Sequence, residues 1–384
     1  MRRLGCLLTV CAMLFCLFPV TVGAVELDIS AKSACLMDIE TGTVLYEENS
    51  HAPLPPASVT KVMTMLLVME AIDAGQIALT DMVAASETAA AKGGSQIYLK
   101  AGEQLSVEEM LKSVAVSSAN DCACALAEHI AGSESAFVDR MNARAQELGM
   151  KDTKFVNCSG LDDDDSAKEH LTSAYDIALM SRELLKNHPD ITKYTTIWMD
   201  SVRDGTFGLS NTNKLVRFYS GATGLKTGFT SGAGYCLSAS ATRDGLGLIA
   251  VVMGAETSQD RFNACRSMLD HGFASYALIQ PTPEEVLSVP VKLGKAEVVT
   301  ATPAEDTALL IDKAQRNTVN IKTELLEEVT APVSKGQRLG TMTVSAGEQV
   351  LREIPLVAET EVPRLTFWEL FVMTLQKVVG ATSN

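Results

Sequence analysis

The spacing of apolar residues divides the chain into segments with different periods. Strand-like segments between residues 34 and 48 flank the turn Glu40–Thr43, which predicts a hairpin. From Ser58 to about Ala74, apolar residues occupy nearly every position until Gly75. A helix without a polar face is a buried one, so we expect residues 58–74 to form a helix inside the protein.

Two later helices begin at recognisable capping signals. Ser106 is followed three residues later by Glu109, which predicts a capping box and a helix that ends at Ser118. Ser173 stands before Asp176 in the same way, ahead of a helix that runs to about Lys186.

The pattern changes to strands after Gly228. Residues 235–242 and 246–253 flank an Asp-Gly pair at Asp244, which is a strong hairpin signal. Residues 261–278 then return to the period of a helix. This mixture of helices and antiparallel hairpins predicts an α+β domain that ends near residue 280.

A second domain follows the Pro-Thr-Pro segment at residues 281–283. Residues 285–362 are rich in valine, threonine and leucine, in short alternating runs separated by glycines. This pattern predicts a small all-β domain that Pro363 ends.

The last segment, residues 366–379, has the period of an amphipathic helix with Trp368 beside its apolar face. It is too short to span a bilayer. It could dock on its own protein or lie in a membrane interface. We favour the interface, because a complete β-domain leaves little core for a terminal helix to join. The apolar face consists of Phe367, Leu370, Phe371, Leu375 and Val378.

The N-terminus has the pattern of a secretory signal peptide. Arg2 and Arg3 precede an apolar run over residues 4–22, and small residues lead to a cleavage position after Ala24. The alternative is a membrane-spanning helix that stays attached, since the run approaches the roughly 20 residues that a span needs.

The net charge argues against a nucleic-acid partner, and the cysteine content indicates the state of the thiols. Removal of residues 1–24 takes away two arginines and changes the net charge from −15 to −17. Nucleic acid is therefore not an expected partner, because binding it needs a basic surface. Six cysteines remain, mostly inside apolar patterns, and we expect buried free thiols. The sequence suggests no metal site and no cofactor.

Three short motifs carry the candidate chemistry, and their order is informative. They are Ser-x-x-Lys at Ser58 and Lys61, Ser-Ala-Asn at Ser118 to Asn120, and Lys-Thr-Gly at Lys226, Thr227 and Gly228.

The first motif suits a serine nucleophile with a lysine base. Residues three apart on a helix share a face, so Lys61 can reach Ser58. To accept a proton, Lys61 must be partly neutral, and burial together with repulsion from Lys226 would lower its pKa. The alternative is a surface lysine after a helix cap.

The other two motifs supply groups for the substrate. Ser118 can pass the proton to a leaving amine, and Asn120 can hold Lys61 and the substrate backbone. Lys226 and Thr227 suit a terminal carboxylate, while Gly228 on an edge strand lets a ligand backbone come close.

Together the motifs resemble the active-site set of the penicillin-binding proteins and serine β-lactamases. The middle motif is Ser-Ala-Asn rather than Ser-Asp-Asn, which points toward the D-alanyl-D-alanine carboxypeptidases of serine peptidase family S11. The resemblance is close over residues 30–280 and looser over 285–384. Further segments that carry it are Phe155–Asn157, Gly160–Leu161, Phe229–Thr230 and Ala233–Tyr235.

The resemblance implies a β-lactamase/transpeptidase-like catalytic domain and a cell-wall hydrolase. Such an enzyme removes the terminal D-alanine from peptidoglycan stem pentapeptides through an acyl-enzyme on Ser58, and β-lactam antibiotics acylate it as covalent inhibitors. It also implies an oxyanion hole from the backbone N–H groups of Ser58 and Phe229. Arg261 would help to bind the substrate carboxylate, with a surface ion pair as its alternative.

Two other functions compete. A class A β-lactamase needs a glutamate in a Glu-x-x-Leu-Asn loop, and the nearest match, Glu183 to Asn187, has lysine in place of leucine within a helical run. A penicillin-binding sensor or scaffold would acylate without turnover, against which the intact motifs argue.

The expected organisation has four parts. They are a signal peptide at 1–24, a catalytic domain at 25–280, a β-rich domain at 281–363 and an amphipathic anchor helix at 364–384. We therefore expect an exported enzyme held at the outer face of the cytoplasmic membrane.

Overall fold

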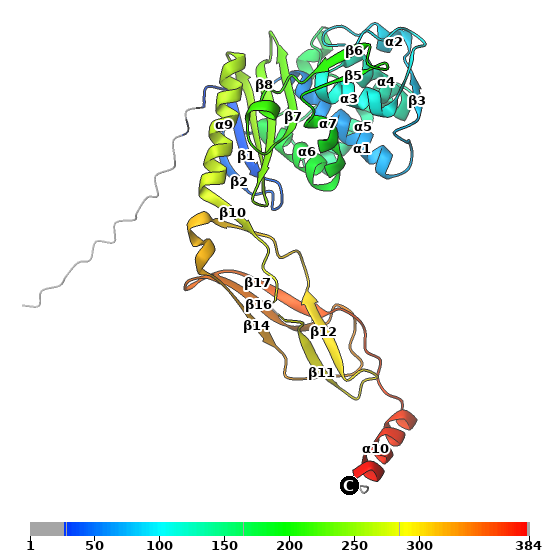
Figure 1. The fold of residues 1–384 in the computed structure, drawn as a ribbon, viewed down its shortest axis with the longest axis vertical. Coiled ribbons are helices and arrows are strands. Elements are labelled where there is room, and N and C mark those ends of the chain that lie inside the picture. The colour runs from blue at the N-terminus through cyan, green and yellow to red at the C-terminus, as the bar shows by residue number, and fades with distance from the viewer. Residues whose placement is uncertain (1–26, 28, 164, 284, 382–384) are drawn as a thin grey trace, which may run out of the picture.

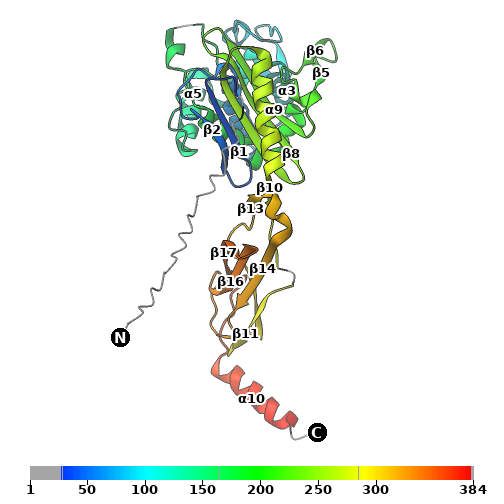
Figure 2. The ribbon, with the colours of Figure 1, turned by 90° about the vertical axis from the view of Figure 1, so that its left-hand side faces the viewer.

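The structure, a computed structural model, describes residues 27–381 except 28, 164 and 284, and leaves the side chains of 166 and 377–381 undescribed. The predicted signal peptide at 1–24 and the side chain of Val378 lie outside the described residues. The described chain forms a first region of mixed helices and strands, a narrower β-region and a terminal helix that follow one another along the long axis (Figures 1 and 2).

An antiparallel five-stranded sheet, in the order β2-β1-β9-β8-β7, organises the first region. The hairpins predicted at 34–48 and around Asp244 are both confirmed. The strands are β1 (Ser33–Asp38), β2 (Val44–Glu48), β7 (Ala222–Thr230), β8 (Gly234–Arg243) and β9 (Leu246–Ala255).

Helices cover both faces of this sheet (Figures 1 and 2). Helix α9 packs on one face and α6 on the other, where α1 lies beyond it among further helices. The helices are α1 (Lys61–Asp73), α2 (Glu87–Ala90), α3 (Val107–Ser117), α4 (Asn120–Ala131), α5 (Glu134–Glu147), α6 (Ala174–Asn187), α7 (Thr192–Thr195), α8 (Leu215–Phe218) and α9 (Ser258–Ser275).

Short elements connect these helices. They are the 3₁₀ turns η1 (Ala57–Thr60), η2 (Asp165–Glu169) and η3 (Pro189–Ile191), with the hairpins β3 (Met82–Ala84)/β4 (Gln104–Ser106) and β5 (Met199–Val202)/β6 (Phe207–Ser210).

The local signals placed most helices correctly. The capping box at Ser106 and Glu109 is present, and Ser173 caps α6 by accepting from the backbone of Asp176. Helix α1 is buried all round as predicted, although η1 forms its first turn.

One helix boundary was wrong. The predicted helix 261–278 begins earlier, at Ser258, because Thr257 and Asp260 form a capping box. It ends at Ser275, and the next residues form strand β10 (Tyr276–Ile279), paired with β13 (Leu309–Asp312). Strand β10 could not be predicted from the local sequence pattern, because its pairing partner β13 lies some thirty residues further along the chain.

The β-region contains a six-stranded sheet in the order β14-β16-β17-β12-β11-β15. Its apolar core is separate from those of the first region. The predicted fold class, an α+β part followed by a small all-β part and a terminal helix, is thus confirmed. The remaining elements are β11 (Ser288–Lys292), β12 (Val298–Pro303), η4 (Lys313–Thr318), β14 (Val319–Leu325), β15 (Val329–Thr330), β16 (Arg338–Ala346), β17 (Gln349–Ala358) and α10 (Phe367–Ala381).

Alanine substitutions at two glycines with similar backbone conformations, Gly149 and Gly160, can test how tightly the loop before η2 packs on η1. Gly160 has φ +82°, and a Cβ there would lie 1.8 Å from the carbonyl oxygen of Ala57. Gly149 has φ +75°, but a Cβ there would meet nothing within 4 Å. Both alanine variants incur the left-handed strain, and only Gly160→Ala also overlaps backbone.

We expect Gly149→Ala to lower the free energy of unfolding by about 1–2 kcal/mol, which is the cost of a strained backbone. Gly160→Ala should lose a further 1–3 kcal/mol, roughly the cost of overpacking. Chemical denaturation of the two variants beside the parent protein measures both. Equal losses would show that the loop yields to the added methyl group.

Candidate active site

The candidate nucleophile lies in the 3₁₀ turn η1, directly before α1. Ser58 follows Ala57, which has φ +48° and is therefore held in a conformation that non-glycine residues rarely adopt. In a 3₁₀ turn, side chains three residues apart eclipse each other. Accordingly, Nζ of Lys61, the first residue of α1, lies 2.9 Å from Oγ of Ser58.

Lys61 is completely buried, so the alternative of a surface lysine is wrong. Its Nζ also donates to the carbonyl oxygen of Ser159, at 2.7 Å. Burial lowers its pKa to about 7, while Cys158 and Asp121 act in the opposite direction. An amine with this pKa is neutral in a large fraction of molecules at neutral pH, which a base requires.

The second motif lies where α3 gives way to α4. Ser118 follows the last residue of α3 in the left-handed conformation, with φ +63°, and Asn120 begins α4. Among the described residues, Oγ of Ser118 and Oδ1 of Asn120 are buried without a hydrogen-bond partner. Both oxygens are thus available to a ligand. Nδ2 of Asn120 donates to the carbonyl of Gly93 at 2.7 Å rather than to Lys61.

The third motif lies on β7, the edge strand of the sheet, as expected. Strand β7 contacts η1, and a Cβ on Gly228 would lie 3.1 Å from the backbone nitrogen of Ser58 and 2.7 Å from the carbonyl oxygen of Pro56. Glycine is therefore what lets the edge strand approach the nucleophile turn. Thr227 Oγ1 donates to Thr212 Oγ1, at 2.6 Å.

Lys226 is also buried, and its Nζ donates to the carbonyl of Thr227 at 2.8 Å. Burial lowers the pKa of Lys226 well below its usual value, and the charges of Lys61 and Arg261 lower it further. The repulsion that we expected to act on Lys61 thus acts on Lys226. A carboxylate arriving in the cleft would oppose these effects and favour the charged form of Lys226.

Phe229 and Arg261 both lie near the end of the edge strand and contact the ring of Tyr235. The ring of Phe229 is 53% exposed and stacks on Tyr235, with 4.3 Å between centroids. The guanidinium of Arg261 is buried and donates to the carbonyls of Gly228 and Cys236. The surface ion pair considered for Arg261 is therefore wrong. Its contact with a substrate carboxylate stays a prediction.

No sequence signal predicted the group that accepts the second hydrogen bond of Lys61. That group is the backbone carbonyl of Ser159, and a carbonyl is present at every position whatever the side chain. The side chain of Asn157 holds the loop by accepting from the backbone of Gly160 at 2.7 Å and donating to the carbonyl of Leu161 at 2.9 Å.

A neutral histidine supports the nucleophile turn and was also missed. His170 Nδ1 accepts from the backbone of Val156, so its Nε2 carries the proton and donates to Thr60 Oγ1 at 2.8 Å. Thr60 Oγ1 in turn donates to the carbonyl of Ala57. Burial, and then the charge of Lys61, lower the pKa of His170 to about 4. His170 therefore stays neutral while Lys61 titrates.

The predicted free thiols are confirmed, since the six cysteines of the described residues are unpaired and buried. One group in the described part of the chain has the spacing of a metal site, namely Glu70, Glu183 and His188. Arg144 donates to both of these carboxylates and supplies a positive charge there.

Comparisons with known proteins agree with the geometry. A family model described as D-alanyl-D-alanine carboxypeptidase matches residues 20–257, and one described as the C-terminal domain of penicillin-binding protein 5 matches residues 279–364. The D-alanyl-D-alanine carboxypeptidase DacF of Bacillus subtilis is 44% identical over 348 residues, which cover 89% of this chain and 88% of that protein.

Solved structures give the same result. Penicillin-binding protein 5 from Haemophilus influenzae matches with a TM-score of 0.76 and 31% identity, covering 89% of this chain and 100% of that chain. Penicillin-binding protein D2 from Listeria monocytogenes, solved in its ampicillin-bound form, matches with a TM-score of 0.59 and 33% identity over 65% of this chain and 99% of its own.

The pKa of Lys61 predicts how nucleophilic attack by Ser58 depends on pH. If the neutral amine accepts the proton of Ser58, the rate of covalent labelling by a fluorescent penicillin should rise with pH and level off above a midpoint near pH 7. Lys61→Arg should abolish labelling at every pH, because arginine cannot lose its proton in a protein. Stopped-flow labelling across this range measures both. A rate that falls through pH 7 would exclude Lys61 as the base.

Proposed function

The chain belongs to the D-alanyl-D-alanine carboxypeptidase family and is a serine-type D-Ala-D-Ala carboxypeptidase; we propose that Ser58, Lys61 and Ser118 carry out its reaction. The observation that supports this assignment most directly is the position of the Lys61 amine. Buried and with a pKa near 7, it lies between Ser58 Oγ and the Ser159 carbonyl.

In the proposed acylation, Ser58 Oγ attacks the carbonyl carbon of the terminal D-Ala-D-Ala peptide bond as Lys61 takes its proton. The negative charge that develops on the carbonyl oxygen is bound by the backbone N–H groups of Ser58 and Phe229. Ser118 passes this proton on from Lys61 to the leaving nitrogen, so that the peptide bond breaks, D-alanine departs and Lys61 is neutral again. Water then hydrolyses the ester on Ser58 and restores the serine.

We assign substrate binding to the edge strand and its neighbours. The terminal carboxylate pairs with Lys226 and Thr227, and the peptide backbone lies along β7 near Gly228. The buried, unpartnered Oδ1 of Asn120 is available to an N–H of the peptide. Arg261 supports this strand through the Gly228 carbonyl and adds positive potential near the carboxylate.

The substrate that we propose is the peptidoglycan stem peptide, with β-lactams as covalent inhibitors. A β-lactam presents a strained amide and a carboxylate in the positions of the scissile bond and the terminal carboxylate. Its amine stays tethered after ring opening, which hinders attack by water. The relative solved in its ampicillin-bound form supports this assignment.

A β-lactamase is disfavoured by the position of Glu183. This residue lies within α6, and its carboxylate accepts from Arg144. It is thus engaged in an ion pair rather than free to activate water beside Ser58. A sensor that acylates without turnover differs from our proposal only in deacylation, which the first test below measures.

We also propose that the enzyme is exported and held at the outer face of the cytoplasmic membrane. The proposed parts are the signal peptide 1–24, the catalytic domain 25–280, the β-rich domain 281–363 and the anchor 364–384. No helix in the described part of the chain is long and apolar enough to cross a bilayer. Helix α10, however, exposes apolar rings, with Phe367 74% and Trp368 71% exposed.

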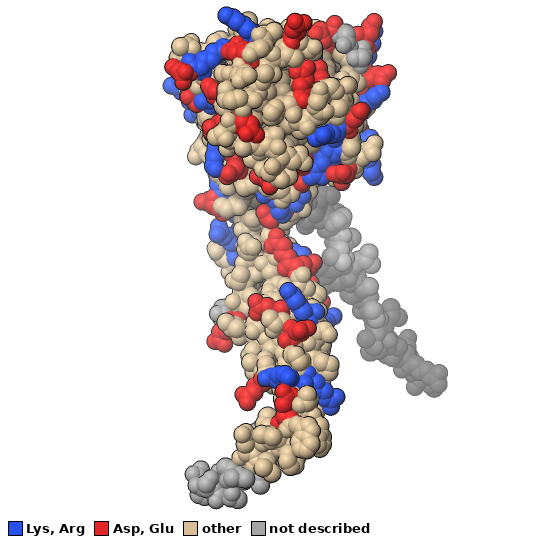
Figure 3. All heavy atoms as spheres, turned by 90° about the vertical axis from the view of Figure 1, so that its right-hand side faces the viewer, with Lys and Arg blue, Asp and Glu red and all other residues tan. Residues whose placement is uncertain are grey.

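The described part of α10 therefore suits a surface-bound helix (Figure 3). Its uncharged atoms gather at the end of the molecule, beyond the charged residues of the β-region. Phe371, Val372 and Leu375 are also at least about half exposed. Trp368 suits the level of the lipid headgroups.

The proposed reaction is tested with a pentapeptide ending in D-Ala-D-Ala and with penicillin. Mass spectrometry should detect released D-alanine, and intact-mass analysis should show one penicillin adduct that Ser58→Ala abolishes. Release without an adduct on Ser58 would contradict the assigned nucleophile. An adduct without D-alanine release would favour the sensor.

The proposed anchor is tested by co-sedimentation with phospholipid vesicles. The protein should pellet with vesicles at low and high salt, since apolar burial is insensitive to screening, while a chain ending at Pro363 should stay in the supernatant and keep its activity on small peptides. Leu375→Asp should weaken binding much more than Gln376→Asp, a matched change at the next exposed position. Equal effects would mean that binding does not use the apolar face.

A further inference from the structure

Two backbone carbonyls hold the motif side chains in place, and both belong to loops. The carbonyl of Ser159 accepts from Lys61 Nζ at 2.7 Å. The carbonyl of Gly93 accepts from Asn120 Nδ2 at 2.7 Å. Neither residue lies in a helix or a strand, so other contacts must fix these carbonyls.

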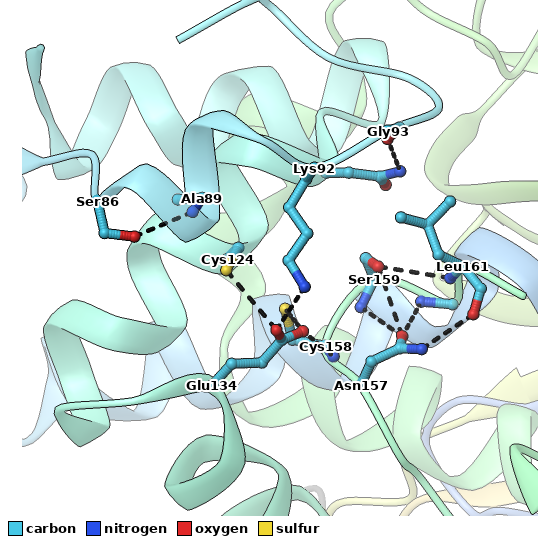
Figure 4. Close-up of polar contacts among 12 residues, drawn as sticks. Ser86, Ala89, Lys92, Gly93, Cys124, Glu134, Asn157, Cys158, Ser159 and Leu161 are labelled. Carbon is cyan, nitrogen blue, oxygen red and sulfur yellow. Dashed lines mark hydrogen bonds and ion pairs between the residues drawn. The ribbon is translucent and has the colours of Figure 1, made fainter. Parts of the chain in front are cut away.

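An ion pair between Lys92 and Glu134, the first residue of α5, lies between the two loops (Figure 4). Lys92, which precedes Gly93, lies with its Nζ 2.6 Å from Oε2 of Glu134. Oε1 of Glu134 accepts from the backbone nitrogen of Cys158, which precedes Ser159, at 3.2 Å. Glu134 therefore holds one loop through its backbone and the other through the neighbouring lysine.

The ion pair between Lys92 and Glu134 is largely shielded from solvent. The side chains of Lys92 and Glu134 are only 21% and 18% exposed. Glu134 stands in the first turn of α5, where the helix dipole favours a negative charge. Burial would raise the pKa of Glu134, but the hydrogen bond and charge of Lys92, together with the hydrogen bonds from Cys158, outweigh it and keep the carboxylate ionised.

The position of the Ser159 carbonyl decides where the lone pair of Lys61 points. A neutral amine has two N–H groups and one lone pair. When one N–H is donated to a fixed carbonyl, rotation about the terminal bond is restricted and the lone pair can be aimed at Ser58. A carbonyl free to shift would leave the amine buried but wrongly oriented.

We propose that Glu134, together with Lys92, is a positioning residue for the reaction. Glu134 aligns the base through the Cys158–Ser159 backbone, and Lys92 aligns Asn120 through Gly93. Neither side chain touches the substrate. This inference rests on the proposed function, because it assumes that Lys61 activates Ser58.

The test compares Glu134→Ala with Glu134→Gln and with a matched control. Glutamine keeps an oxygen that can accept from the Cys158 backbone, whereas alanine removes it. Glu183→Ala is the control, since Glu183 is also 18% exposed and paired with a base, Arg144, but does not bind the loop of Ser159. Thermal melting first establishes a temperature at which all variants are folded.

The rate constant for penicillin acylation is then measured for each folded variant. Glu134→Ala should lose between about 10-fold and 100-fold, as expected for misplacement of a catalytic group by about 1 Å. Glu134→Gln should stay within about 3-fold of the parent, as should Glu183→Ala, because in both the acceptor for Cys158 remains.

Lys92→Met tests the second loop. It leaves the contact between Glu134 and Cys158 in place, so the acylation rate constant at saturating penicillin should be nearly unchanged. Release of Gly93 should loosen Asn120 and raise the KM for the D-Ala-D-Ala peptide.

Three results would overturn the inference. The first is a Glu134→Ala variant that acylates like the parent. The second is an equal loss in Glu134→Ala and Glu183→Ala, which would indicate a general effect on stability. The third is an unchanged KM in Lys92→Met. If the parent protein itself forms no adduct on Ser58, the proposed function fails instead.

Discussion

In the proposed mechanism, the catalytic region depends on a lysine that loses its proton at neutral pH while staying in contact with a serine. Desolvation favours the neutral amine, and burial is the cause that lowers the pKa of Lys61 from its ordinary value to about 7. Burial of Lys61 requires apolar neighbours on every side of α1. The helix without a polar face, visible in the sequence, follows from this requirement.

The same constraint explains why the hydrogen-bond acceptor of Lys61 is a carbonyl. A carboxylate at the position of Ser159 would stabilise the ammonium form and raise the pKa again. A backbone carbonyl orients the amine with a much weaker preference for the charged form. The buried carboxylate of Asp121 serves another purpose, since it accepts from the backbone of Ile97 and Leu99 and holds the loop that carries Gly93.

The sequence predicted those parts of the site that depend on side-chain identity. Ser58 and Lys61, the proposed nucleophile and base, lie together as the motif spacing predicted, and the edge strand carries Gly228 as expected. The Ser159 carbonyl and the Lys92–Glu134 pair could not be predicted, because a carbonyl has no sequence signature and a lysine and a glutamate 42 positions apart are not a local pattern. Strand β10 was missed for a similar reason, since its partner β13 lies far along the chain.

The β-region separates the catalytic region from α10, which lies at the opposite end of the molecule (Figures 1 and 2). Its longest strand, β17, has 10 residues, and a strand of that length spans roughly 33 Å. If α10 lies in the membrane surface, the β-region acts as a spacer between the membrane and the catalytic region. The catalytic region would then stand clear of the lipid headgroups, where the cell wall lies. Polymeric substrate is found there, and a site placed directly on the membrane would reach less of it.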